Sequence, residues 1–121
     1  MILVDTSVWI DHFRNGNKLL ADLLTNSDVC AHPFVAGELA CGNLKNRKNI
    51  LNLLSKLTPV FIADNQEALH FIEQNHLMGK GLGLVDIHLL ASCAISDALL
   101  WTLDKRLSTI AHQMHLEYKR N

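Results

Sequence analysis

The chain has 121 residues, which is enough for one domain and too few for two, so we expect a single domain over residues 1–121. Hydrophobic residues make up 49% of it and charged residues 19%, a composition that supports a sizeable core and excludes intrinsic disorder. Eleven lysines and arginines oppose twelve acids, and this formal net charge of −1 indicates neither a strongly basic nucleic-acid-binding surface nor an acidic tail.

The cysteines and the N-terminus favour a soluble protein of the reducing cytoplasm. Cys30, Cys41 and Cys93 are odd in number and lack a CxxC spacing, which argues against a disulfide framework and a cysteine zinc site. An acid at position 5 argues against a signal peptide. The most apolar window, residues 84–103, contains two aspartates, and each would cost roughly 2.5–3.5 kcal/mol at a bilayer centre, so we expect no membrane span.

In the first half of the chain, short apolar runs alternate with segments of helical periodicity. Residues 2–4 form an apolar run typical of a buried strand. Apolar residues at 50, 53, 54 and 57 have the spacing of an amphipathic helix. In chain order we predict a strand at 2–4, helices at 8–14 and 19–24, a strand at 28–32, helices at 33–41 and 50–57, and a strand at 60–63.

The second half continues this alternation. We predict a helix at 65–77, a loop with glycines at 79, 81 and 83, a helix at 86–95, a strand at 98–101, a helix at 105–114 and a candidate edge strand at 116–118. Strands alternating with helices imply parallel pairing and right-handed crossovers. The fold class is therefore α/β, a three-layer sandwich with a central parallel sheet of four to five short strands and helices on both faces. Ligands of such sheets bind at the carboxyl ends of the strands.

Two acids lie at that edge of the predicted sheet. Asp5 directly follows the first strand, and Asp104 follows the strand at 98–101. Each also precedes a predicted helix, where aspartate is a good N-cap, so both a capping and a functional interpretation stay open. Thr102 lies two residues before Asp104, and in extended chain their side chains point the same way.

Two further acids fall on or beside apolar helix faces. Glu38 has apolar residues three and four positions away on its helix, and so does Asp86. Acids are rarely buried without a partner, which favours a function, although a solvated edge for Glu38 and an N-cap for Asp86 are the alternatives. Asp97 ends the helix of Asp86, where we expect it to face the other side, and Asp11 is expected to be solvated.

Four carboxylates gathered at one edge would repel one another strongly unless they were protonated or bound to cations. A set of oxygen ligands suits hard cations such as Mg²⁺ or Mn²⁺. The three loop glycines lack the strand and the Lys-Ser/Thr of a nucleotide loop, and no histidine is assigned to catalysis. The residues thus indicate a divalent-metal site.

Removing these four charges from the net charge of −1 leaves +3 on the rest of the chain. Basic residues flank three of the four acids, which suits a polyanionic substrate, although a solvated face has the same pattern. These candidate RNA-binding residues are Lys45, Arg47, Lys48, Lys80, Lys105 and Arg106.

Four segments carry a resemblance to a known family, and it spans residues 2 to about 116. They read VDTSVWID at 4–11, GEL at 37–39, GLVDIHLLA at 83–91 and LWTLDKRL at 100–107. In this order and spacing they resemble PIN-domain ribonucleases, and most closely the VapC toxins of type II toxin–antitoxin systems.

The resemblance implies a PIN-like sandwich and metal-dependent endonucleolytic cleavage of RNA with Mg²⁺ or Mn²⁺, leaving 5′-phosphate and 3′-hydroxyl ends. It also implies a homodimer and a VapB-like antitoxin whose C-terminal segment lies over the acids. The acids that the resemblance makes catalytic and metal-binding are Asp5, Glu38, Asp86 and Asp104, with Thr6, Ser7 and Thr102 as supporting polar residues. It does not identify the RNA.

Two other functions remain open for these residues. One is a catalytically silent PIN-like module that binds RNA or a protein, which a metal-dependent nuclease assay would separate. The other is a metal-dependent phosphatase with Asp5 as nucleophile, which would require a second acid at position 7, where the chain has Ser7.

Overall fold

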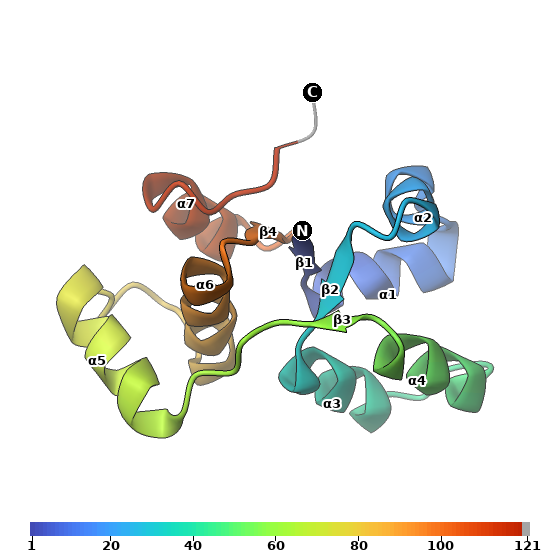
Figure 1. The fold of residues 1–121 in the computed structure, drawn as a ribbon, viewed down its shortest axis with the longest axis horizontal. Helices are drawn as coiled ribbons and strands as arrows, with labels where there is room; N and C mark the ends of the chain where they lie inside the picture. Colours follow the sequence, from blue (N-terminus) through green and yellow to red (C-terminus); the bar gives the residue numbers. More distant parts are fainter. Residues whose placement is uncertain (120–121) are drawn as a thin grey trace.

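The structure, a computed structural model, describes residues 1–119, so the last two residues of the expected domain lie outside the described part. Seven helices and four strands alternate along these residues (Figure 1). In chain order they are β1 (Ile2–Val4), α1 (Thr6–Asn15), α2 (Lys18–Thr25), β2 (Val29–Ala31), α3 (Pro33–Cys41), α4 (Arg47–Ser55), β3 (Thr58–Pro59), α5 (Asn65–Asn75), α6 (Leu84–Ser96), β4 (Leu99–Trp101) and α7 (Lys105–Gln113).

Local sequence explains where several helices begin. Proline at the first position of α3 has the backbone angle of a helix and needs no hydrogen-bond partner for its nitrogen. Asn17 caps α2 by accepting from the Leu20 amide at 3.0 Å. Asp64 and Glu67 form a reciprocal capping box at the start of α5, with bonds of 2.8 and 3.1 Å.

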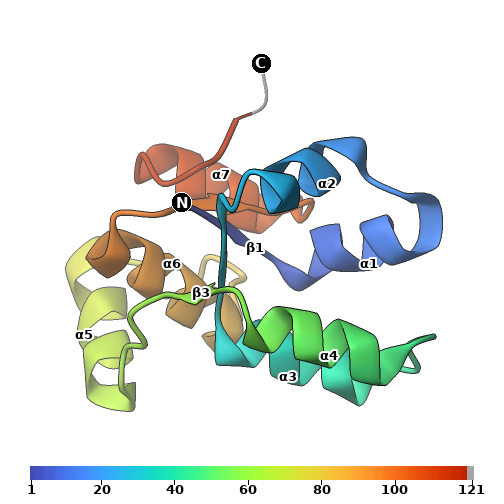
Figure 2. The ribbon, with the colours of Figure 1, turned by 45° about the vertical axis from the view of Figure 1, so that its right-hand side comes forward.

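The four strands form one parallel sheet in the order β3-β2-β1-β4. Ile2 of β1 is in register with Val29 of β2 on one side and with Leu99 of β4 on the other. Helices α1 to α4 lie on one side of the sheet and α5 to α7 on the other, as the two views of Figures 1 and 2 show. The predicted α/β three-layer sandwich is therefore confirmed.

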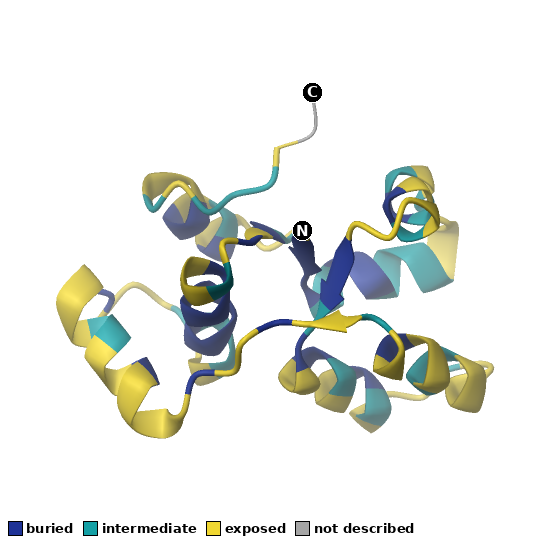
Figure 3. Ribbon diagram, viewed as in Figure 1, coloured by how far each residue is buried: buried dark blue, intermediate teal, exposed yellow. Residues whose placement is uncertain are grey.

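The core lies between the sheet and its helices, with α6 as the most deeply buried helix (Figure 3). Seven consecutive residues of α6, from Ile87 to Cys93, are buried, whereas α5 buries only Ala68. Leu3, Leu89 and Leu100 have no exposed surface, and truncating such a side chain typically costs about 2–5 kcal/mol.

Within residues 1–119, no helix combines the length and apolar character needed to cross a bilayer. All three cysteines are free.

The predicted strand at 60–63 is wrong, because β3 comprises only Thr58–Pro59. Its neighbour β2 ends at Ala31, two residues before α3 begins, so the Val60 amide makes the last bond, to the Ala31 carbonyl at 3.0 Å. The chain beyond it has no strand to pair with. The predicted helix at 50–57 also shifts, to the bounds of α4, and the edge strand at 116–118 reduces to a single bridge between Leu100 and Glu117.

Candidate active site

Asp5 is held at the carboxyl end of β1 by three neighbours. Its amide donates to the Trp101 carbonyl at 2.9 Å, which extends the pairing of β1 with β4. Its Oδ2 accepts from the Ser7 hydroxyl at 2.8 Å and from the Thr102 hydroxyl at 2.7 Å. Although Asp5 occupies the N-cap position of α1, its side chain makes no capping bond, and only 8% of the residue is exposed. The capping interpretation of this residue is therefore wrong.

Asp104 does cap its helix. Its Oδ1 accepts from the amides of Arg106 and Leu107 at 2.9 and 3.2 Å, which satisfies two free donors at the start of α7. The Asp104 amide donates to the Thr102 hydroxyl at 3.0 Å, and that hydroxyl in turn donates to Asp5. One threonine thus connects the two acids that follow β1 and β4.

Glu38 comes to this edge from α3. Its Oε1 accepts from the Thr6 hydroxyl at 2.7 Å, which joins α3 to the first residue of α1. The expectation that Glu38 lies on a buried face is wrong, because the residue is exposed. Of the apolar neighbours that suggested burial, Phe34 and Cys41 are themselves exposed and only Val35 is buried.

Asp86 stands third in α6 and is half-buried. Its Oδ2 accepts from the Gly83 amide at 3.0 Å, a bond that closes the start of the helix. Burial raises the pKa of its carboxyl, as do the negative charges of Asp5, Asp104 and Glu38, while the bond from Gly83 lowers it. The four predicted acids therefore lie within electrostatic reach of one another.

The extra acids lie elsewhere. Asp97 is the exposed C-cap of α6, in a left-handed conformation with φ of 54°, about 16 Å along the helix from Asp86. Asp11 on α1 accepts from the side-chain amides of Asn15 and Asn17, at 3.0 and 3.2 Å. Neither residue influences the pKa of Asp86, in contrast to the other three acids of the group.

The donor set fits a hard divalent cation. Within residues 1–119 none of the four acids forms an ion pair, since the salt bridges there involve only Glu117. Each of the four has one carboxylate oxygen that makes no hydrogen bond in this part of the chain. No three histidine, cysteine or acidic side chains of the described range converge tightly enough to hold an ion as they stand. Oxygen-only ligands select Mg²⁺- or Mn²⁺-like ions.

The six candidate RNA-binding residues are all exposed and fall into two groups. Lys45, Arg47 and Lys48 lie where α3 turns into α4, and Arg47 donates to the Ala40 carbonyl at 3.1 Å. Lys80 lies in the glycine loop before α6, and Lys105 and Arg106 form the start of α7. In the second group, Lys105 and Arg106 directly follow Asp104, and Lys80 lies in the loop that leads to the helix of Asp86.

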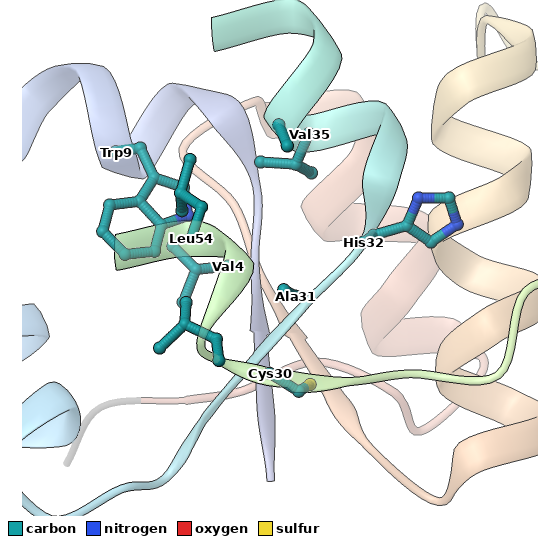
Figure 4. A pocket seen from close by; sticks show the side chains of 9 residues that line it. Val4, Trp9, Cys30, Ala31, His32, Val35 and Leu54 are labelled. Atoms are coloured by element: carbon teal, nitrogen blue, oxygen red, sulfur yellow. The ribbon is translucent and has the colours of Figure 1, made fainter. Parts of the chain in front are cut away.

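A buried histidine pair is the feature that the sequence did not reveal. His32 and His88 are 1% and 4% exposed, and their ring centroids lie 6.5 Å apart. Nδ1 of His32 accepts from the Phe34 amide at 3.0 Å and so caps α3, the helix that carries Glu38. Figure 4 shows the His32 ring turned away from the apolar side chains of Val4 and Trp9.

Burial, together with the nearby His88, lowers the pKa of His32 from 6.5 to about 4, and burial is the larger cause. The neutral ring is also what its capping role demands, because Nδ1 must be unprotonated to accept a bond. A histidine directly before a proline that begins a helix was the available signal in the sequence.

Comparison with known proteins gives one family match and two curated relatives. The sequence model of the PIN domain family matches residues 2–113, a span that includes all four acids. Two curated relatives, both named Ribonuclease VapC32, come from the Mycobacterium tuberculosis strains CDC 1551 / Oshkosh and ATCC 25618 / H37Rv. Each is 45% identical to this chain over 108 residues, which cover 88% of this chain and 87% of the relative.

Proposed function

The chain belongs to the PIN domain family, in its VapC-type branch, and on that premise we propose that it is a metal-dependent endoribonuclease and the toxin of a type II toxin–antitoxin pair. The observation that carries the proposal is the cluster of four carboxylates, two held by hydroxyl groups and two by backbone amides, without a cationic partner among residues 1–119. We also assign the whole chain to one PIN domain and to the cytoplasm.

Asp5 and Asp86 are the main metal ligands in this proposal, with Glu38 and Asp104 completing the shell directly or through water. An Mg²⁺ or Mn²⁺ ion held there would lower the pKa of a bound water molecule. It would also offset the negative charge that develops on the phosphate and the leaving oxygen. Hydrolysis breaks the bond from phosphorus to the 3′-oxygen and leaves a 5′-phosphate and a 3′-hydroxyl.

The chain's own hydroxyl groups prepare these ligands. Ser7 and Thr102 both donate to Oδ2 of Asp5, so Oδ1 is the oxygen left to face a cation. Thr6 restrains Glu38 in the same way through Oε1. Such neighbours of metal ligands typically change metal affinity or activity 10- to 100-fold when they are removed.

A homodimer and a VapB-like antitoxin are the proposed protein partners. Several large apolar side chains are exposed, and such surface commonly marks interfaces. They include Phe34, Phe61, Ile62, Leu69, Leu84 and Leu103, each 38–54% exposed. Trp9 does not contribute to this surface because it is buried in the core.

The test is cleavage of RNA by the purified protein with Mg²⁺ or Mn²⁺ and with EDTA, followed by sequencing of the new ends. We expect cleavage only with metal, and 5′-phosphate ends. Asp86→Asn should abolish cleavage, while Asp97→Asn, the matched change at the other end of α6, should not. RNA binding without cleavage by the wild type would instead favour a catalytically silent module. Cleavage by Asp86→Asn but not by Asp97→Asn would overturn the assignment of Asp86.

A further inference from the structure

The side chain of Arg106 covers the glycine loop that precedes α6. If Gly81 carried a Cβ atom, that atom would lie 2.9 Å from Nη1 of Arg106 and 3.2 Å from its Cδ. Real Cβ atoms essentially never show the first distance, and the second is tighter than most, so an alanine here would shift the end of the arginine side chain. From this contact we propose that Gly81 holds Arg106 in place to bind a backbone phosphate of the RNA beside the four acids, an assignment that rests on the proposed function.

The contact joins the two segments that carry Asp104 and Asp86. The Arg106 amide donates to Oδ1 of Asp104 at 2.9 Å, which fixes the backbone from which the arginine side chain extends. Two residues after Gly81, the Gly83 amide donates to Oδ2 of Asp86 at 3.0 Å. The Arg106 side chain thus reaches from the start of α7 across the loop that leads into α6, at the border of the acid cluster.

The charge of Arg106 is not used within the described fold. Its guanidinium forms no ion pair and no hydrogen bond with any group of residues 1–119, although Asp104 stands two residues before it and the loop that it crosses leads to Asp86. An arginine that served only stability would be expected to pair with one of these acids. A planar guanidinium with several donors instead suits a phosphate, to which it can donate two parallel bonds.

Gly81 contributes by ordering this side chain before the RNA arrives. Ordering a long side chain on binding costs affinity, and a side chain that is already packed in place avoids part of that cost. The neighbouring Gly79 is a control, because it shares the backbone conformation of Gly81 but does not contact Arg106. Gly79 and Gly81 have left-handed φ values of 72° and 80°, but a Cβ on Gly79 would meet no atom within 4 Å.

The experiment compares Gly81→Ala with Gly79→Ala, because both variants carry the same backbone strain and only the first displaces Arg106. The probe is a labelled random-sequence RNA oligonucleotide, and its binding is measured by fluorescence anisotropy at several salt concentrations in EDTA, so that the proposed nuclease does not cut the probe during the measurement. We expect Gly81→Ala to weaken binding about tenfold more than Gly79→Ala, the size of one lost charge-assisted bond.

Arg106→Ala should weaken binding at least as much and reduce the slope of log affinity against log salt by about one, with Arg106→Lys restoring the slope. In the Arg106→Ala background, Gly81→Ala should then have no larger effect than Gly79→Ala. Unchanged affinity and salt slope in Arg106→Ala would overturn the phosphate assignment, and equal binding by the two glycine variants would overturn the role of Gly81. If the wild type neither binds nor cuts RNA, the proposed function itself fails, together with this inference.

Discussion

Two junctions of this fold place an aspartate between a strand and a helix and use it in opposite ways. Asp5 joins β1 to α1, and Asp104 joins β4 to α7. Asp104 stands three residues beyond its strand, is exposed, and accepts two amides of the helix that it begins. Asp5 follows its strand directly, so its amide still pairs with the sheet, and its buried carboxylate accepts hydroxyl groups instead.

The difference shows which acid the fold needs for stability. Replacing an N-cap aspartate by alanine typically costs about 1 kcal/mol, so Asp104 stabilises α7 whatever else it does. Asp5 caps no helix, and its buried carboxylate lies among like charges and forms no ion pair with any cation of residues 1–119. Both aspartates stand between a strand and a helix, and the distance of each from the end of its strand decides whether it caps the helix.

The largest effect is expected from Asp5→Asn in the RNA cleavage assay. Because Asp5 is a proposed metal ligand, its loss should exceed the roughly 10- to 100-fold effects of residues that only orient ligands. Asp104→Asn should also lower the cleavage rate, but with the helix intact, because asparagine caps as well as aspartate. Wild-type rates for Asp5→Asn would show that this buried acid has no catalytic part.

His32 also caps a helix, and its capping bond depends on pH because the acceptor nitrogen of the ring can take up a proton. Its pKa is lowered to about 4 in the fold, so the unfolded chain binds the additional proton first as the pH falls. The contribution of His32 to the free energy of unfolding should be complete above pH 6.5 and decline toward pH 4, by on the order of 2–3 kcal/mol. Protonation would also remove the bond from the Phe34 amide at the start of α3.

Urea denaturation between pH 7.5 and pH 4 measures this effect. His32→Asn provides the control, since asparagine can cap the helix without titrating. We expect a flatter pH dependence in the variant, and parallel curves for the two proteins would contradict the account.

A smaller effect is expected from Thr102→Val, which tests the link between the two junctions. The valine removes the hydroxyl that donates to Asp5 and accepts from the Asp104 amide. Loss of these partners should lower the free energy of unfolding by about 1–3 kcal/mol and also slow cleavage. Thr102→Ser keeps the hydroxyl and should retain both properties in the same melting and cleavage assays, whereas equal behaviour of the two variants would indicate that packing alone matters.

Much of this arrangement could be predicted from local sequence. Short apolar runs alternating with helical periodicity predicted the parallel sheet and which acids follow its strands. The role of each acid could not be predicted in this way, because capping and burial depend on contacts between Asp5 and Thr102, which lie 97 residues apart. The end of β3 likewise depends on where its neighbour β2 stops, and the His32–His88 pair depends on packing of α3 against α6.

Thermal melting with EDTA and with millimolar Mg²⁺ or Mn²⁺ tests the central claim, that the four acids form a metal site, most directly. A cation that binds only the folded chain at a hundredfold excess over its Kd stabilises it by about 2.7 kcal/mol, so the wild-type Tm should rise by several degrees. Asp5→Asn should raise the Tm in EDTA, because it removes a repelling charge, and lose most of the response to metal. Asp97→Asn should behave as the wild type. A wild-type Tm that neither metal changes, or an Asp5→Asn Tm that metal raises as much as it raises the wild-type Tm, would contradict the metal site.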